Sequence, residues 1–428
     1  MGKYQGYQKY KDSGVEWLGD IPKHWELKRF KFSFYLVNNK IEAENSNLSY
    51  MGLEHIESWT GKRIEDKNAS SEGIGSHFLP NDVLFGKLRP YLAKVYLSEI
   101  EGLASTEALV LRCKNNILPN FSKYYILSRD FINIVDSSTF GAKMPRASWD
   151  FIGNLFFTFP PLDEQEKIAQ FLDYKTKQID ELIKKKETLI EKLDEKRTAL
   201  ISHAVTKGLD PSVPMKDSGI EWLGDIPNHW KRIPFRWCCY ITEGQVDPTQ
   251  PKFKLLPLIA PNHIESQTGK IIAKESAEDQ GAISGKFFYQ SGTLLYSKIR
   301  PALVKACISD EDGLCSADMY PIKTSNNLLN QFMLYQILSK NFTQLAILVS
   351  DRVAMPKVNR ETLGGFPILV PPLKEQQKIA EYLDQKTTQI DQQKAKIKEA
   401  IELLKEYRTS LITNAVTGKI DVREVAIP

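Results

Sequence analysis

Two short basic motifs carry the side chains of this sequence that are best suited to bind a polyanion. They read Lys87-Leu88-Arg89-Pro90 and Lys298-Ile299-Arg300-Pro301, and each follows a short apolar run typical of a buried strand. Residues two apart on a strand face the same side, and lysine and arginine can hold phosphates or contact the O6 and N7 atoms of guanine. Because both motifs are alike, we expect them to hold a DNA backbone rather than to read bases. The alternative is a solvated basic edge strand that prevents aggregation.

A second set of basic residues flanks a Met-Pro dipeptide near the end of each β-like stretch. The set consists of Lys143 and Arg146 in the first half and Arg352 and Lys357 in the second. A charged loop tip before a buried strand can enter a DNA groove, or it can be a surface loop with ordinary solubilising charge. Weaker candidates for reading sequence lie where the two halves have no clear correspondence: Lys62, Arg63 and Lys67.

Motifs of catalysis are missing from the sequence. It has no phosphate-binding loop, no Rossmann glycine fingerprint, and no Asn/Asp-Pro-Pro-aromatic motif of the kind that amino-methyltransferases use at the target base. The six histidines show no metal-ligand spacing. We therefore predict a non-catalytic protein with no catalytic residue, no metal site and no cofactor. Two histidine pairs that recur between the halves are expected to be structural: His24 with His229, and His55 with His263.

Composition and cysteine usage limit the compartment. No apolar run approaches the roughly 18 residues that span a bilayer, so no membrane association is expected. The five cysteines form no C-x-x-C pair, which favours buried thiols in a reducing cytoplasm. The formal net charge of +4 permits a nucleic-acid partner without requiring one, so any basic surface must be local.

The elements that must position these residues are encoded twice. The segment Trp-Leu-Gly-Asp-Ile-Pro stands at Trp17 to Pro22 and again at Trp222 to Pro227. Pro-Pro-Leu followed by Glu-Gln and Ile stands at Pro160 to Ile168 and again at Pro371 to Ile379. A repeat of roughly 200 residues is the size of one globular domain plus one long helix. The repeat predicts pseudo-twofold architecture and a ligand that also has two halves.

Each Pro-Pro-Leu opens a long segment that contains neither glycine nor proline. Apolar residues recur every seven positions in both segments, which predicts a pair of antiparallel coiled-coil helices. These positions are Leu172, Ile179, Leu193 and Leu200, and Leu383, Ile390, Ile397, Leu404 and Leu411. The d column is weaker and includes Leu182 and Leu189. Ile183, Ile190 and Ile401 widen the apolar stripe, so we expect them to bind a partner besides the facing helix.

These features predict an α+β fold with an internal pseudo-twofold repeat: two β-rich domains separated by two long antiparallel helices. The predicted boundaries are 1–160 for the first domain, 161–206 for the first helix, 207–215 for a linker, 216–371 for the second domain, 372–417 for the second helix and 418–428 for a C-terminal tail. About 42 helical residues give a rod of roughly 60 Å, which is close to two turns of B-DNA.

Taken together, the two Pro-Pro-Leu helix starts and the two Trp-Leu-Gly-Asp-Ile-Pro segments resemble the specificity subunits of type I restriction–modification systems. The resemblance covers nearly the whole chain. It implies two target recognition domains, each reading one half of an asymmetric, bipartite site in double-stranded DNA. It further implies that the helices set the gap and dock two modification (methyltransferase) subunits, and that restriction (translocase) subunits join the larger complex.

Two other interpretations stay open at the level of sequence. One is a fused restriction–modification enzyme, which the missing catalytic motifs disfavour. The other is a coiled-coil scaffold whose two domains bind other proteins, and the modest net charge is compatible with it. The differing interiors of the two halves favour the DNA reader, because identical domains would read a palindrome.

Overall fold

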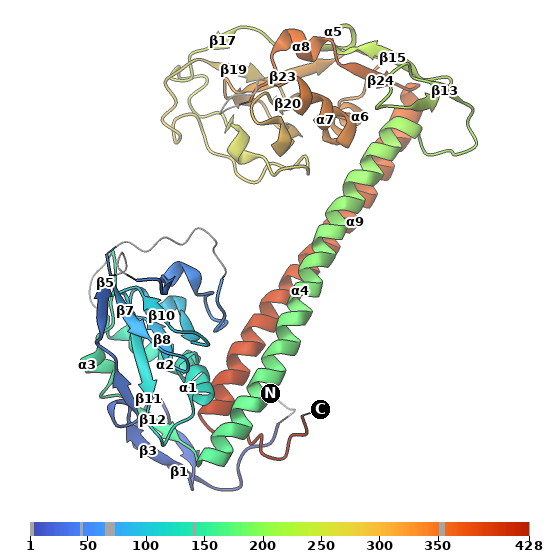
Figure 1. The fold of residues 1–428 in the computed structure, drawn as a ribbon. Coiled ribbons are helices and arrows are strands. Elements are labelled where there is room, and N and C mark those ends of the chain that lie inside the picture. The colour runs from blue at the N-terminus through green and yellow to red at the C-terminus, as the bar shows by residue number, and fades with distance from the viewer. Residues whose placement is uncertain (1–3, 43–45, 65–72, 140–142, 351–355, 428) are drawn as a thin grey trace. The chain divides into compact units, whose positions relative to one another are not determined.

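The computed structural model describes residues 4–42, 46–64, 73–139, 143–350 and 356–427 (Figure 1). The chain divides into two compact units, Met1–Lys186 with Lys398–Pro428, and Glu187–Ile397. Each unit therefore contains one β-rich part and a portion of each long helix. The domain boundaries predicted from the sequence stay a prediction.

In the first unit, two four-stranded sheets form the β-rich part. One has the order β5 (Lys40–Glu42), β7 (Ile74–Phe78), β10 (Gly102–Ala104), β6 (Ser49–Met51), and the other the order β4 (Phe34–Leu36), β11 (Ala108–Cys113), β8 (Val83–Gly86), β9 (Val95–Leu97). Two strand pairs complete it: β1 (Tyr10–Asp12) with β2 (Asp20–Pro22), and β3 (Glu26–Arg29) with β12 (Phe156–Phe159). The short helices are α1 (Pro119–Ile126), α2 (Arg129–Ser137) and α3 (Trp149–Ile152), with 3-10 turns η1 (Phe30–Phe32), η3 (Leu53–His55) and η4 (Pro90–Leu92).

The second unit repeats this topology strand for strand. Its sheets have the orders β17 (Gln245–Val246), β19 (Lys286–Tyr289), β22 (Gly313–Cys315), β18 (Leu258–Ile259), and β16 (Cys239–Ile241), β23 (Met319–Thr324), β20 (Leu294–Ser297), β21 (Ala306–Ile308). The strand pairs are β13 (Met215–Asp217) with β14 (Asp225–Pro227), and β15 (Lys231–Pro234) with β24 (Pro367–Val370). The helices are α5 (Phe235–Cys238), α6 (Asn330–Leu338), α7 (Lys340–Val349) and α8 (Arg360–Gly364), with 3-10 turns η5 (Pro261–His263) and η6 (Pro301–Leu303).

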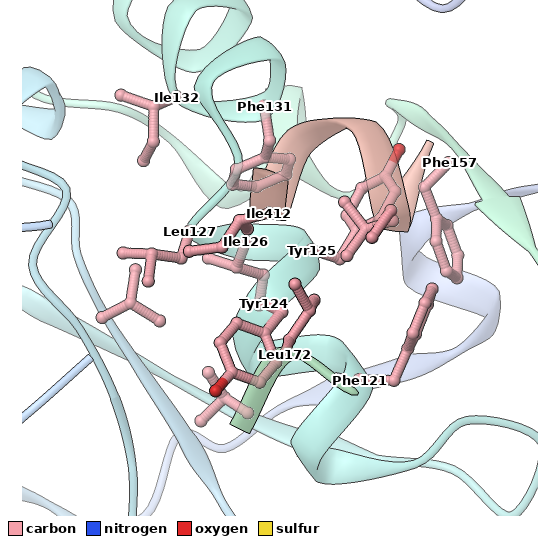
Figure 2. Packing of buried hydrophobic residues seen from close by; sticks show 14 of the residues in the cluster. Phe121, Tyr124, Tyr125, Ile126, Leu127, Phe131, Ile132, Phe157, Leu172 and Ile412 are labelled. Carbon is pink, nitrogen blue, oxygen red and sulfur yellow. The ribbon is translucent and has the colours of Figure 1, made fainter. Parts of the chain in front are cut away.

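The two long helices are α4 (Leu162–Lys207) and α9 (Leu373–Val416). In the first unit, Leu172 near the start of α4 and Ile412 near the end of α9 share one core with aromatic residues of the β-rich part (Figure 2). In the second unit, the end of α4 and the start of α9 share the other core. The helices therefore run antiparallel, and the predicted α+β fold of two β-rich domains with two packed long helices is confirmed.

The heptad assignment needs one correction. Leu182 and Leu189, placed in the d column, are 43% and 48% exposed, whereas Leu172, Ile179 and Leu193 are buried. The buried face of the helix pair consists of the a column and the adjacent e positions. A helix that packs both on a second helix and on a globular domain needs a wider apolar face than a coiled-coil helix. Ile401 is accordingly buried, and Ile183 is partly buried against the core of the first unit.

A buried glutamine explains the Pro-Pro-Leu-x-Glu-Gln motif. The Gln376 side chain accepts a hydrogen bond from the Leu329 backbone N–H at 2.8 Å and donates to the carbonyl oxygens of Asn327 and Pro371 at 2.8 and 2.7 Å. Gln165 makes the equivalent three bonds in the first unit. Each glutamine links the turn between a strand and a long helix to the segment just before a short helix, α6 or α1. It thereby pairs backbone groups that would be costly to leave unpaired once buried.

We therefore expect Gln376→Leu to lower the free energy of unfolding by about 2–4 kcal/mol, because buried backbone donors and acceptors lose their partner. Gln377→Leu, one residue further along and exposed, serves as the matched control and should change stability by less than about 0.5 kcal/mol. Urea denaturation of the full chain measures both values. Equal stability of the two variants would contradict the assigned role.

The recurring histidines have structural partners. His24 and His229 pair through Nε2 with Glu164 and Glu375, at 2.8 and 2.7 Å. His55 is buried and its Nδ1 accepts the Gly52 backbone N–H at 3.0 Å; His263 caps η5 in the same way. The histidine pairs therefore act at equivalent positions in the two halves, as the sequence predicts.

An arginine on a long helix fastens the β-rich part to the helix pair in each unit. In the first unit, the Arg408 guanidinium donates to Asp180 Oδ1 at 3.0 Å and to the carbonyl oxygens of Trp59 and Thr60 at 2.8 and 2.9 Å. Lys62 pairs with the same aspartate at 2.7 Å. Lys62 is therefore paired with a long helix, and its role in sequence reading stays a prediction; Lys67 lies outside the described residues.

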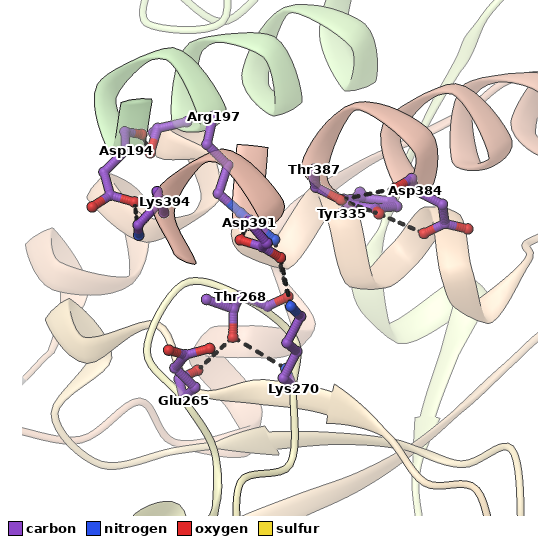
Figure 3. Close-up of polar contacts among 11 residues, drawn as sticks. Asp194, Arg197, Glu265, Thr268, Lys270, Tyr335, Asp384, Thr387, Asp391 and Lys394 are labelled. Atoms are coloured by element: carbon purple, nitrogen blue, oxygen red, sulfur yellow. Dashed lines mark hydrogen bonds and ion pairs between the residues drawn. The ribbon is translucent and has the colours of Figure 1, made fainter. Parts of the chain in front are cut away.

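The same device recurs in the second unit (Figure 3). Arg197 donates to Asp391 Oδ1 at 2.6 Å and to the Thr268 carbonyl oxygen at 3.3 Å, and Lys270 pairs with Asp391 at 2.6 Å. In both units the arginine and the aspartate come from different long helices and the lysine from a loop of the β-rich part. We call the two sets the Arg408 lock and the Arg197 lock.

Candidate nucleic-acid interface

The structure brings the two basic motifs of the first half together. The Met-Pro loop runs alongside the end of the Lys-Leu-Arg-Pro segment, so that Ala147 N–H donates to the Lys87 carbonyl oxygen at 2.9 Å and Arg89 N–H to the Pro145 carbonyl oxygen at 2.8 Å. Between these bonds, Leu88 and Arg146 form an isolated antiparallel bridge. The segment Lys87 to Pro90 and the Met-Pro loop around Arg146 therefore lie side by side. We call these two paired segments the basic ridge of the first unit.

The second half forms the same ridge. Val358 N–H donates to the Lys298 carbonyl oxygen and Arg300 N–H to the Pro356 carbonyl oxygen, both at 2.8 Å, around a bridge between Ile299 and Lys357. Arg352 lies outside the described residues. In the first ridge, Lys143 is exposed in the loop. The ridges therefore have the same backbone geometry in both units.

The arginine of each ridge has an unusual backbone conformation. Arg89 and Arg300 have φ values of 50° and 46°, in the left-handed region, and each precedes a 3-10 turn that begins with proline. Strand β8 (Val83–Gly86) ends before Lys87, so both residues follow the strand, and the expectation that they face one side stays a prediction. A non-glycine residue in this region costs about 1–3 kcal/mol and is typical of functional sites.

A surface hollow of about 430 Å³ lies beside the ridge of the first unit. Its lining combines cationic, acidic and aromatic side chains from several elements, among them Asn38, Lys40, Lys87, Glu107, Arg146 and Trp149. Strands β4, β5, β7 and β11 provide the walls, and the start of α3 provides Trp149. The hollow therefore gathers donors, acceptors and an aromatic ring around the predicted basic residues.

Glu107 fixes the direction of the Arg146 guanidinium. Arg146 donates through Nε to Glu107 Oε2 at 2.9 Å and through its NH2 nitrogen to Oε1 at 3.2 Å. These hydrogen bonds raise the pKa of Arg146 above its ordinary value, so the side chain stays cationic. A planar guanidinium held by a carboxylate at one edge can present its other edge to a ligand.

At the corresponding place in the second unit, an arginine stands where the first unit has Trp149. Arg360 donates to Glu243 Oε1 at 2.7 Å, and its guanidinium lies 5.7 Å from the ring centre of Tyr320 and 6.0 Å from that of Phe287. Lys298 Nζ lies 5.6 Å from the Tyr320 ring centre. The ridge of the second unit therefore borders a different set of side chains.

Within the described ranges, no group of three histidine, cysteine, aspartate or glutamate side chains could hold a metal ion. No helix among the described residues is sufficiently long and apolar to cross a membrane. What the arrangement can do is bind: it offers charged donors to phosphates and planar donors to base edges.

The family model for the type I restriction modification DNA specificity domain matches residues 77–192 and 256–403, one match in each half. The chain belongs to this family. As a type I specificity subunit, it is a non-catalytic component of a restriction–modification system.

Relatives agree with this assignment. This specificity subunit is 28% identical over 311 residues to the specificity subunit of the type I restriction enzyme EcoDI from Escherichia coli, covering 69% of each chain. It is 24% identical over 429 residues to the MjaVIII specificity subunit of Methanocaldococcus jannaschii, covering 95% of each chain.

Solved structures show the same fold. A chain from a structural study of complex assembly and conformational transition in the type I R-M system superposes with a TM-score of 0.68 at 18% identity, covering 92% of this chain and 98% of that one. The HsdS subunit from Thermoanaerobacter tengcongensis superposes with a TM-score of 0.52 at 19% identity, covering 94% and 98%.

Sequence reasoning missed several residues of the interface. Lys40, Trp149, Glu243 and Arg360 carry no motif and stand at different distances along the chain from the basic ridges. The signal that could have revealed two of them is the repeat itself, because Trp149 and Arg360 occupy equal positions after the two Met-Pro dipeptides. Their difference marks a place where two otherwise similar domains diverge.

Proposed function

We propose that this specificity subunit recognises an asymmetric, bipartite site in double-stranded DNA, with one β-rich domain reading each half. The observation that carries the proposal is the pair of basic ridges, which share their backbone geometry and the lysine–arginine pairs Lys87/Arg89 and Lys298/Arg300, each beside a differently lined surface. The shared lysine–arginine pairs are suited to bind the phosphate backbone, which is the same in every half-site. The differing residues beside them are suited to contact base edges, which differ between half-sites. The eight basic residues predicted to bind DNA keep that role as proposals.

We further propose that the subunit assembles with two modification subunits, which supply the methyl-transfer chemistry, and with restriction subunits, in the cytoplasm. The antiparallel helices are the proposed docking surface and the proposed spacer between the half-sites. Ile183, Ile190 and Ile401, predicted from the sequence to bind partners, are half-buried or buried. Beyond the first residues of the two helices, Leu162 and Leu373, the exposed large apolar side chains on the helices are Leu182, Leu189, Leu403 and Tyr407. We propose these four as the better candidates.

The proposal is tested by mapping methylated bases in DNA treated with the purified complex and S-adenosylmethionine. We expect methylation at one bipartite sequence with unlike halves, and no methylation by the specificity subunit alone. DNA binding by the complex should weaken steeply as salt rises, with a log–log slope of about −0.9 for each phosphate contact. Methylation by the single chain would support a fused enzyme instead, and salt-independent or absent DNA binding would support a protein scaffold.

Replacing residues 26–158 with the same segment of another specificity subunit should change only one half of the methylated sequence. The reason is that each compact unit has its own core and its own ridge. Sequencing of methylated sites from the exchanged complex measures this. An altered second half-site would contradict independent reading by the two domains.

A further inference from the structure

The internal repeat allows the two domains to be compared residue by residue through their strand registers. Lys40 pairs with Ser76 across β5 and β7, and Gln245 pairs with Phe287 across β17 and β19. Leu36 pairs with Leu111 and Ile241 with Ile322 in the other sheet. These registers fix which residues of the second domain stand where the first domain has its hollow.

The equivalent residues fall into two groups. Lys87 and Arg89 are the same in the second domain, as Lys298 and Arg300. The lining residues differ: Asn38 corresponds to Glu243, Lys40 to Gln245, Ser76 to Phe287, Leu109 to Tyr320 and Trp149 to Arg360. Groups that contact a shared feature of two half-sites can stay the same, whereas groups that contact unlike bases must differ.

In the second domain, Arg360 contacts or lies near most of the residues that differ from the first domain. Its guanidinium donates to Glu243 Oε1 at 2.7 Å and to the Thr242 carbonyl oxygen at 3.4 Å, and lies near the rings of Phe287 and Tyr320. These partners correspond to Asn38, Val37, Ser76 and Leu109, all of which line the hollow of the first domain. The Arg360 side chain is still 36% exposed, so part of its fork faces solvent.

We propose that Arg360 determines specificity in the second half-site by donating to the O6 and N7 atoms of a guanine, with Glu243 as the residue that positions its guanidinium. The inference rests on the proposed DNA-reading function. A bidentate contact from arginine to guanine is the commonest specific contact in the major groove. The Glu243 carboxylate and the nearby rings of Phe287 and Tyr320 restrict the guanidinium, so less freedom is lost when its remaining N–H groups bind.

The first domain cannot make this contact at the equivalent position. Its α3 begins with Trp149, N-capped by Ser148, where α8 begins with Arg360, N-capped by Asn359. An indole ring offers one donor and an apolar face, which suits a thymine methyl group or a sugar rather than a guanine edge. The two half-sites are therefore unlike at this position.

The assignment is tested with the assembled complex and a DNA library in which the second half-site is randomised. Methylation of each sequence is read for the wild type, Arg360→Met, Arg360→Lys and Glu243→Gln. Lys323→Met is the matched control. Lys323 is an exposed cation on β23, the strand that also carries Tyr320. Its counterpart in the first domain, Arg112, does not line the hollow. Thermal unfolding of each variant confirms that it is folded.

We expect Arg360→Met to reduce preference for guanine at one position of the second half-site by about 5- to 150-fold, the range measured for one bidentate base contact. Arg360→Lys should recover only part of this preference, because lysine has the charge without the fork. Glu243→Gln should give a smaller loss at the same position. Preference in the first half-site and preference in Lys323→Met should stay at the wild-type pattern.

Uniformly weaker methylation by Arg360→Met, with base preference unchanged, would overturn the assignment and make Arg360 a phosphate or structural residue. A broadened first half-site would overturn it as well. A wild-type complex without any sequence preference would instead overturn the proposed function, and with it this assignment, so the two failures are distinguished by the wild-type arm.

Discussion

Replacing the four shared ridge residues, by Lys87→Gln, Arg89→Gln, Lys298→Gln and Arg300→Gln together, reduces the salt dependence of DNA binding by the complex. If each cation neutralises one phosphate, the log–log slope against salt becomes shallower by about 3.6. Binding weakens alike for specific and unrelated sequences, because backbone contacts position the protein without reading bases.

The measurement is a titration of labelled duplexes, with and without the methylated sequence, at several salt concentrations. The control replaces four exposed lysines of the long helices, Lys184, Lys185, Lys396 and Lys398, which changes net charge by the same amount. We expect the control to alter the slope by less than about 1, because these lysines form a solvated helix face. If the control had as great an effect as the ridge variant, binding would depend on overall charge rather than on the ridges.

The second large effect is a loss of stability when the arginine of the Arg408 lock or of the Arg197 lock is replaced. Arg408→Met should lower the free energy of unfolding by about 3–5 kcal/mol, because the partly buried Asp180 loses one of its two cations and two loop carbonyl oxygens lose their donors. Adding Asp180→Leu should restore part of this loss, since no uncompensated charge then remains. Lys405→Met, on the exposed face of the same helix, should cost less than about 0.5 kcal/mol.

Unfolding followed by calorimetry and hydrogen exchange distinguishes the locks, because each belongs to one compact unit. Arg408→Met should destabilise the first unit, and Arg197→Met the second. In methylation mapping, each variant should loosen discrimination in the half-site read by its own domain. Equal effects of both variants on both units would show that the locks do not act locally.

Much of the architecture follows from the sequence. The repeated motifs predict two domains of one topology, and the spacing of Leu172, Ile179 and Leu193 predicts long packed helices, because both signals depend on local periodicity. The assignment of Leu182 and Leu189 to the buried d column was wrong, because both side chains are exposed. Periodicity along one helix reports how wide the apolar stripe is, but it does not report whether a second helix or a β-rich domain covers each edge of the stripe.

The candidate nucleic-acid interface was likewise predicted only in part. The sequence by itself determined that Lys87, Arg89 and their counterparts recur in the same local motif, between an apolar run and a proline, since a repeat is visible without coordinates. Only the tertiary structure decided that the Met-Pro loop pairs with them and that Arg360 lies beside Glu243, Phe287 and Tyr320. Those neighbours come from separate strands and from a short helix, and strand pairing between distant segments leaves no periodic trace in the chain.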